Sequence, residues 1–314
     1  MMEHLTHLRT NDGSGWLGCG INSDKEGAST LKTNQSRLLK RYKDYNDLVN
    51  NFHLLPTASI FKLPDGTFSS EKEVLVAFYN IPPAALKRIF QDRRNNHCLN
   101  ECPYCGQPGK PDTLDHFMPE SHWPEFAIYP DNLVPQCENC ARKKSNRYYS
   151  LTKSACYFIH PMYETALSQV GFEITMQIVA GIIEYKPRIH LNGSANPVIM
   201  RRIRQHIESL EIPDYIVRYC RNQHAELIDA INKANAMSAP FDFKLHCERL
   251  LESERVKAGI AEGKTMSSFP NWACAFYHAL IHSSDIINFY LSQFHLPPNR
   301  PSPCVPVTST LLYP

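Results

Sequence analysis

The stretch that decides the fold runs from residue 102 to residue 147 and reads CPYCGQPGKPDTLDHFMPESHWPEFAIYPDNLVPQCENCARKKSNR. It carries two Cys-x2-Cys pairs, Cys102 with Cys105 and Cys137 with Cys140, separated by an insert of 31 residues. A Cys-x2-Cys turn directs two thiolates toward one point, and two such turns complete a tetrahedral four-thiolate zinc site. Because protein fills all four positions, we predict a structural zinc ion that joins the two ends of the insert. Four unrelated buried thiols are the alternative, which this spacing disfavours.

An adjacent acid and histidine, Asp115 and His116, lie within the insert. We predict a short strand over 113–117, in which neighbouring side chains point to opposite faces. A bend or bulge there would turn both side chains toward one metal ion and one phosphate group. Asp115 is an oxygen donor suited to Mg²⁺ or Mn²⁺. His116, neutral near pH 7, is able to accept a proton from an attacking water. For an isolated Asp-His dipeptide, an ordinary surface pair is the alternative.

Two further features accompany this pair. Asn132 has amide groups that could hold the loop of the insert, and through it the direction of the imidazole. Arg142, Lys143, Lys144 and Arg147 place four positive charges within six residues directly after the last cysteine. Such a patch could contact the phosphate backbone of a nucleic acid. Alone, a charge run is typical of a solvated face; next to a zinc-held insert, we interpret it as nucleic-acid-binding.

Taken together, these residues resemble the HNH (ββα-metal) endonuclease family, whose pattern is C-x2-C, a D-H-x-x-P-x-S core, and N-L-x3-C-x2-C followed by Asn or His, two residues of any kind and Lys. The resemblance covers residues 102–147. It implies a β-hairpin that carries Asp115 and His116, a helix after Cys140, and one divalent catalytic metal ion. It also implies that His116 is the general base, Asp115 a metal ligand and Asn132 the residue that holds the loop. The implied reaction cleaves a phosphodiester bond and leaves 5′-phosphate and 3′-hydroxyl ends.

Two positions depart from the family pattern. The family places Asn or His directly after the last cysteine, as the second ligand of the catalytic metal, where this sequence has Ala141. His160 and Asn146 are the candidate replacements, although Asn146 is a poor geometric match on an ideal helix. Asn139 is expected to point away because it lies between two zinc ligands. Glu120 occupies a position where many relatives carry Lys, and its negative charge would weaken contact with DNA there.

The whole chain has 314 residues, of which 43% are hydrophobic and 20% charged, and its formal net charge is +2. This composition excludes disorder throughout and favours about two folded domains. No apolar run approaches the roughly 18 residues that a membrane span needs. The N-terminus lacks the apolar stretch of a secretory signal, so we expect a cytoplasmic location.

We predict an α+β fold with a zinc-stapled ββα-metal core, a β-hairpin and a mainly helical C-terminal part. The alternation of apolar and polar residues predicts hairpin strands over 172–178 and 182–190, on either side of Gly181. Helical periodicity and proline breaks predict helices over 36–54, 84–94, 197–209, 214–235, 243–262 and 272–293. The expected parts are a flexible leader at 1–36, an HNH nuclease domain with N-terminal helices at 37–165, a hairpin and helical domain at 166–296, and a proline-rich tail at 297–314.

The sequence therefore predicts a metal-dependent endonuclease that cleaves nucleic acid, DNA rather than RNA, with structural Zn²⁺ and catalytic Mg²⁺ or Mn²⁺. Its architecture resembles nuclease subunits of bacterial anti-phage defence systems of the Septu-like and retron-associated kinds, which implies an ATPase partner. Two other functions stay open. One is a zinc-containing module that binds nucleic acid or protein and has weak or no activity because of Ala141; the other is a purely structural zinc scaffold.

Overall fold

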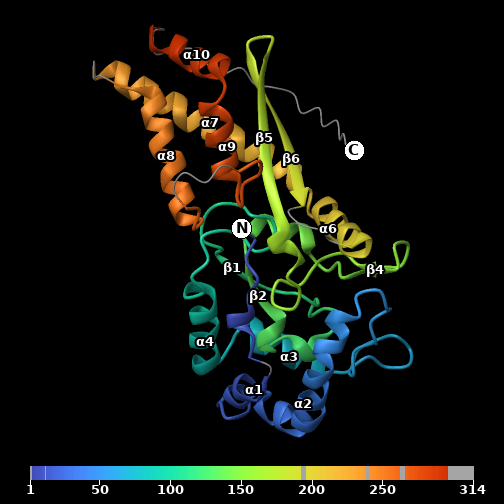
Figure 1. The fold of residues 1–314 in the computed structure, drawn as a ribbon. Helices are drawn as coiled ribbons and strands as arrows, with labels where there is room; N and C mark the ends of the chain where they lie inside the picture. Colours follow the sequence, from blue (N-terminus) through green and yellow to red (C-terminus); the bar gives the residue numbers. More distant parts are fainter. Residues whose placement is uncertain (1, 11, 192–195, 238–240, 262–265, 296–314) are drawn as a thin grey trace. The chain divides into compact units, whose positions relative to one another are not determined.

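The computed structural model describes residues 2–10, 12–191, 196–237, 241–261 and 266–295. The predicted tail at 297–314 lies outside the described residues. The chain forms two compact units (Figure 1). The motif unit consists of the described residues within 2–169 and 193–210, and the hairpin unit of those within 170–192 and 211–314. No helix in the described part of the chain combines the length and apolar character that crossing a membrane requires.

The motif unit is built from helices around two short antiparallel strand pairs. Its helices are α1 (Ser14–Ile21), α2 (Ala28–Asn50), α3 (Glu71–Asn80), α4 (Ala84–Asn95), α5 (Glu138–Lys144) and α6 (Pro197–Leu210). Its strands are β1 (Thr113–His116), β2 (Leu133–Gln136), β3 (Tyr149–Ser150) and β4 (Ala155–Cys156). Single 3-10 turns are η1 (Thr6–Leu8), η2 (Pro124–Phe126), η3 (Pro130–Asn132) and η4 (Ala166–Gln169). This mixture of helices and small sheets confirms the predicted α+β class.

The predicted ββα arrangement is present, with both strands between the two cysteine pairs and the helix starting inside the second pair. Strand β1 pairs antiparallel with β2, so that His116 lies opposite Leu133. Helix α5 begins directly after Cys137, whose side chain accepts a hydrogen bond from the backbone N–H of Cys140. The first turn of α5 is thereby capped, and the fourth cysteine is brought back toward the third.

The hydrogen-bonding pattern of β1 leaves two carbonyl groups on its free edge. Phe117 donates its N–H to Asn132 across the pair, and antiparallel residues alternate between bonded and non-bonded positions. Leu114 and His116 therefore direct their carbonyls away from β2. Pro135 lies opposite Leu114, where a residue without an N–H is tolerated. These two carbonyls need donors from elsewhere in the unit.

Helix α2 packs against the loop between β1 and β2. Its buried apolar residues recur at helical spacing, at Leu31, Leu38, Tyr42, Tyr45 and Val49. Tyr42 stacks on Tyr129 with ring centroids 4.4 Å apart. Tyr45 meets Phe126 edge to face at 4.9 Å. Aromatic contacts of this kind hold the loop between β1 and β2 against α2.

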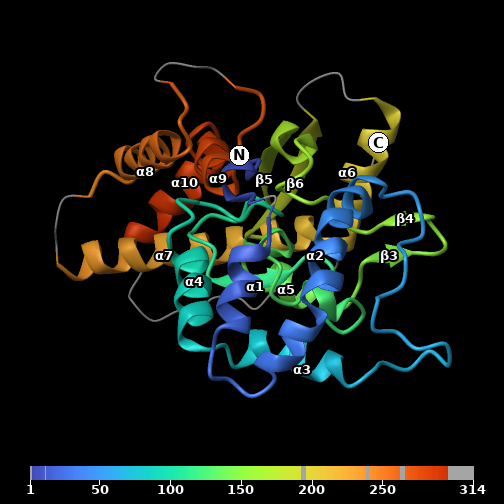
Figure 2. The same cartoon turned by 90° about the horizontal axis from the view of Figure 1, so that it is seen from below.

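The predicted flexible leader at 1–36 is wrong, because much of this segment is helical and packed. Helix α1 lies between α2 and α4 (Figure 2), and the side chains of Met2 and Leu5 are fully buried. A Cβ at Gly20 would lie 2.8 Å from the Leu31 side chain, and one at Gly13 would lie 2.5 Å from the Tyr42 ring. Gly13 and Gly20 therefore permit close packing within a segment that was predicted to be flexible.

The hairpin unit combines a long two-stranded ribbon with helices. Its elements are β5 (Val170–Val179), β6 (Ile182–Leu191), α7 (Ile212–Ala236), α8 (Phe243–Lys257), α9 (Trp272–Ile281), α10 (Ser284–Ser292) and the 3-10 turn η5 (Gln293–His295). The strands meet at Ala180 and Gly181, which both have positive φ, 51° and 77°. Two left-handed residues match the two-residue turn that the right-handed twist of a hairpin favours.

Several predicted helices have other limits in the structure: the one over 36–54 is Ala28–Asn50, and the one over 243–262 is Phe243–Lys257. The helix predicted over 272–293 is two helices, because Ser283 accepts a hydrogen bond from the N–H of Ile286 and so begins α10. The helix predicted over 197–209 is present as α6, but it packs on α5 within the motif unit. The expected domain limits of 37–165 and 166–296 therefore differ from the two compact units, which are each built from two chain segments.

Candidate metal centre and active site

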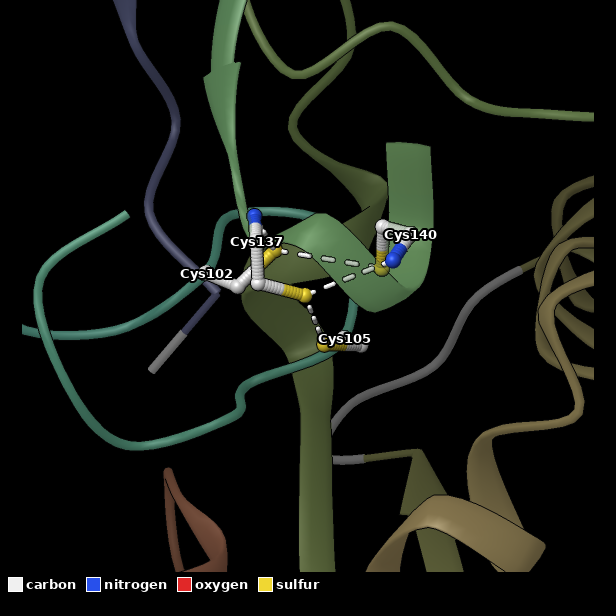
Figure 3. Close-up of side chains that lie close together, drawn as sticks. All are labelled: Cys102, Cys105, Cys137 and Cys140. Atoms are coloured by element: carbon white, nitrogen blue, oxygen red, sulfur yellow. Dashed lines mark hydrogen bonds between the residues drawn. The ribbon is translucent and has the colours of Figure 1, made fainter. Parts of the chain in front are cut away.

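The sulfur atoms of the four cysteines converge on one point (Figure 3). The Sγ atoms of Cys102 and Cys140 are 3.9 Å apart, and those of Cys105 and Cys137 are 3.8 Å apart. A disulfide would need about 2.05 Å. A tetrahedral site with Zn–S bonds of about 2.3 Å has S···S edges of about 3.8 Å. The geometry therefore fits a four-thiolate metal site, and all four side chains are buried.

Local hydrogen bonds prepare these thiols for a cation. The N–H of Cys137 donates to the Cys102 sulfur at 3.4 Å, and that of Cys140 to the Cys137 sulfur at 3.5 Å. The pKa of Cys137 is lowered, first of all by a hydrogen bond from the Cys102 thiol. Burial raises the pKa of Cys105. One thiolate is thus easily formed, and a bound divalent cation would stabilise the remaining ones.

Helix α6 is fastened to the cysteine centre by His206. Its Nε2 donates to the carbonyl of Tyr104, between the first two cysteines, at 2.7 Å. Its Nδ1 accepts the N–H of Ile159 at 3.1 Å, and its ring stacks on the Tyr104 ring. Both ring nitrogens are bonded in the neutral form, and burial lowers the pKa of His206 to about 4.

Acid is expected to destabilise the motif unit through His206. The pKa of His206 is about 4 in the folded protein, against an ordinary value of 6.5. The folded protein favours the neutral form of His206. The contribution of this residue to the free energy of unfolding is therefore complete above about pH 6.5 and is lost as the pH falls toward 4. Between pH 6.5 and pH 5 the free energy of unfolding should fall by about 2 kcal/mol for this residue. Urea unfolding at both pH values measures the fall. His206→Gln should show a smaller one, and an equal fall in both proteins would contradict the prediction.

His116 lies at the end of β1 with one ring nitrogen tied to the loop. Its Nε2 is 2.8 Å from the carbonyl oxygen of Ala127, which can only accept, so Nε2 carries the proton. Nδ1 is then the basic nitrogen. It has no hydrogen-bond partner among the described residues. It is also not one of the fully buried polar atoms that lack a partner in that part of the chain, so it is not completely shielded from solvent. Burial lowers the pKa of His116 to about 4, so the imidazole is neutral at pH 7.

Asn132 holds the loop that carries the Ala127 carbonyl. Its Nδ2 donates to the carbonyls of Met118 and Phe126, at 3.0 and 3.1 Å. Its Oδ1 accepts the N–H of Met118 at 2.7 Å and the hydroxyl of Tyr45 at 2.8 Å. The fully buried Asn132 amide therefore makes four hydrogen bonds, the arrangement that a loop-holding asparagine requires.

Asp115 is held beside a buried lysine. Its Oδ2 accepts from Lys144 Nζ at 2.8 Å and from Gln136 Nε2 at 2.7 Å. Lys144 also donates to the carbonyl of His116, one of the two on the free edge of β1. Only 1% of the Lys144 side chain is exposed, against 31% of Asp115. Lys144 therefore connects α5 to β1, and its prediction as a nucleic-acid contact is wrong in this structure.

The other predicted cations also do not form one solvated patch. Arg147 donates to the carbonyls of Lys143 and Ser209 and so joins α5 to α6. Its guanidinium lies over the Phe158 ring. Arg142 is 65% exposed, lies 3.6 Å from Glu138 and donates to Oδ1 of Asn139 at 2.9 Å. Arg147 is thus largely committed to the fold, while Arg142 stays available to a ligand.

The two candidate replacements for the missing metal ligand, His160 and Asn146, differ in their surroundings. Both nitrogens of the buried His160 are bonded, Nε2 to the carbonyl of Asp131 at 3.0 Å and Nδ1 to the N–H of Met162 at 3.2 Å. His160 is therefore a structural histidine. Asn146 is exposed and lies beyond the end of α5. Asn139 bonds Gln107 through Nδ2 at 3.0 Å, as expected for a side chain that points away.

Glu120 lies next to the His116 imidazole. From the sequence, we expected its negative charge to weaken contact with DNA. Its Oε2 is 3.5 Å from Nε2 of His116, and its side chain is 26% exposed. Oε2 is buried and has no hydrogen-bond partner among the described residues. Burial, and then the charge of Asp115, raise the pKa of Glu120 to about 7. Its negative charge is therefore only partial near neutral pH.

Comparison with known proteins shows what this part of the chain is similar to. Residues 102–147 match the HNH endonuclease family model, and the ββα geometry of this segment agrees with that match. The chain is similar to Protein ea31 of Escherichia phage lambda, with 26% identity over 196 residues. The alignment covers 59% of this chain and 62% of the relative, which is less than two thirds of the relative's length. No solved structure matches the chain.

Proposed function

We propose that the chain is a metal-dependent endonuclease that hydrolyses phosphodiester bonds, in DNA rather than RNA, and that Zn²⁺ occupies the four-cysteine site. The HNH domain supports a nucleic-acid substrate. The observation that carries the proposal is the tethered imidazole of His116, whose Nε2 is bonded to Ala127 while Nδ1 is free of protein partners among the described residues. A neutral imidazole with one free basic nitrogen is the form that a general base needs.

In the proposed reaction His116 accepts a proton from water at Nδ1 while the water oxygen forms a bond to phosphorus. The bond from phosphorus to the 3′ oxygen breaks, that oxygen takes a proton from solvent, and the ends are 5′-phosphate and 3′-hydroxyl. Asn132 keeps the Ala127 carbonyl in place and so fixes the imidazole. A divalent ion bound at Asp115 would supply positive charge near the leaving oxygen.

Asp115 offers such an ion one carboxylate oxygen, because Lys144 and Gln136 bind the other. Ala141 offers no ligand atom. Among the described residues, only the four cysteines form a group of three or more metal-ligating side chains that lie close enough together to hold an ion. Mg²⁺ often keeps several waters and binds through one or two carboxylates together with substrate phosphates. The donors present therefore fit Mg²⁺ or Mn²⁺ held jointly by Asp115 and the substrate.

A plasmid assay tests the activity. The zinc-loaded protein is incubated with supercoiled DNA in Mg²⁺, in Mn²⁺ and in EDTA, and with a labelled RNA of matched sequence. The proposal expects nicked or linear DNA in either metal, none in EDTA, and slower cleavage of RNA. Intact DNA in all conditions, from a folded protein with its full metal content, would refute it.

Replacing Ala141 with asparagine is expected to raise the cleavage rate at limiting Mg²⁺ by about tenfold or more. The amide oxygen would add a second protein ligand beside Asp115, and more oxygen ligands strengthen Mg²⁺ binding. The rate is measured over a Mg²⁺ titration. Arg142→Asn, on the exposed neighbouring residue, is the control and should not gain activity. No gain from Ala141→Asn would show that the site takes no ligand from this position.

Ala141 also favours a second candidate function, a zinc-containing module that binds nucleic acid or protein without cleaving it. Electrophoretic mobility shift in EDTA separates the candidates. A protein that shifts DNA but never nicks it, even as Ala141→Asn, fits the binding module. A folded protein that neither binds at low salt nor cuts fits a structural scaffold.

We further propose that the chain acts in bacterial anti-phage defence together with an ATPase. The support is the resemblance in architecture noted from the sequence, a compact HNH core with long flanks. An ATPase encoded by the adjacent gene that forms a stable complex with this chain, and protection from phage that requires His116, are the expected results. Protection that is unchanged in His116→Ala would contradict this role.

A further inference from the structure

Tyr79 of helix α3 touches the active site from outside the HNH segment. Its hydroxyl donates to the carbonyl of Leu114 at 2.5 Å. Its ring meets the His116 ring edge to face, with centroids 4.2 Å apart and planes at 62°. Leu114 is the second residue whose carbonyl faces the free edge of β1. One side chain therefore contacts both the backbone of the catalytic strand and the imidazole on it.

The Tyr79 ring is itself fixed by neighbouring helices. It lies 5.6 Å from the ring of Phe90 on α4, and Phe90 lies 5.5 Å from the ring of Trp16 on α1. Burial raises the pKa of Tyr79 to about 12, so the hydroxyl keeps its proton and remains a donor. Tyr79 is thus a rigid neutral support with little freedom to leave the imidazole.

The hydrogen bond to Ala127 alone does not fix the imidazole. A single bond from Nε2 restrains that atom but permits the ring to tilt about it, which would move Nδ1. The edge-to-face contact with Tyr79 blocks this tilt, and the bond to Leu114 fixes the strand from which His116 projects. Catalytic groups misplaced by about 1 Å lose about 100-fold in rate, so such support has a large effect.

We propose that Tyr79 is a positioning residue that holds the His116 imidazole in the Nε2–H tautomer with Nδ1 directed toward the attacking water. The proposal rests on the endonuclease function proposed above. It extends the active site beyond the HNH segment to helix α3, so an isolated segment of residues 102–147 would lack part of the machinery that orients its base.

Two variants separate the contacts of Tyr79. Tyr79→Phe keeps the ring and removes the hydroxyl, and should lower kcat about threefold to tenfold, the effect of one hydrogen bond. Tyr79→Leu removes the ring as well and should lower kcat about 100-fold. KM and metal content should not change in either variant. The control is Tyr277→Phe, which removes a hydroxyl bonded to Gln223 in the hairpin unit and should leave kcat unchanged.

Side-chain ¹H–¹⁵N NMR of His116, assigned with His116→Gln, gives a readout that does not need activity. We expect one Nε2–H tautomer in the wild type and in Tyr79→Phe, and a mixture of tautomers in Tyr79→Leu. Wild-type kcat and tautomer in both variants would overturn the proposal. If Tyr79→Leu fails to fold, an unchanged kcat in Tyr79→Phe overturns it. An inactive wild type whose tautomer is still lost in Tyr79→Leu would refute the endonuclease and support the positioning role.

Discussion

Replacing His116 with glutamine is expected to lower the single-turnover rate of DNA cleavage by about 1,000-fold or more. A positioned general base contributes about 10²–10⁴ in rate, and glutamine has no basic nitrogen. Its amide could still donate to the Ala127 carbonyl that His116 now bonds at 2.8 Å. The loop between β1 and β2 should therefore stay in place, and the loss should appear in catalysis rather than in folding.

The measurement uses an end-labelled duplex with enzyme in excess, and metal content and thermal unfolding are recorded for the same samples. His282→Gln, at an exposed position in the hairpin unit, is the control and should cleave like the wild type. A His116→Gln protein that retains most of the wild-type rate would refute the assignment of the base, whatever its stability.

Removing the metal from the cysteine centre is expected to unfold the ββα core. Structural zinc contributes on the order of 10 kcal/mol to small zinc-dependent folds, which is comparable to the total stability of a domain. The centre joins the chain before β1 to the start of α5, and α5 carries Lys144, which holds Asp115. Cys140→Ala should therefore lose both its metal and the cooperative unfolding transition of the motif unit.

Elemental analysis and circular dichroism melting check this expectation. Cys98→Ser is the matched control because Cys98 is an exposed cysteine four residues before the first metal-binding one, and it should retain both metal and melting transition. A Cys140→Ala protein that melts like the wild type would show that the four sulfurs are merely packed together.

The ββα core was predictable because its determinants are local. The Cys-x2-Cys turns lie close to the elements they join, and a hairpin with a following helix needs no distant partner. His116 and Asn132 were placed correctly within it for the same reason. Their catalytic roles stay proposals, but the hydrogen bonds of Asn132 match the role that the family resemblance implied.

The basic run after the last cysteine was misread because burial depends on tertiary structure. Lys144 faces β1 and Arg147 faces α6, and nothing in the spacing of the run distinguishes them from Arg142. The supports of the site, Tyr45 and Tyr79, come from helices distant in sequence. Tyr45 lies within a predicted helix, whereas Tyr79 lies on α3, where the sequence predicted none. Neither position predicts the hydrogen bond to Asn132 or to Leu114.

The most direct test of the central claim is an experimental structure of the chain with Mn²⁺ and a short duplex carrying an uncleavable linkage, with anomalous scattering to identify each metal. We expect zinc among the four cysteines, one manganese ion on the Asp115 carboxylate, and a backbone phosphate facing Nδ1 of His116. A duplex bound elsewhere, or a well-ordered duplex at His116 with no manganese on Asp115, would contradict it.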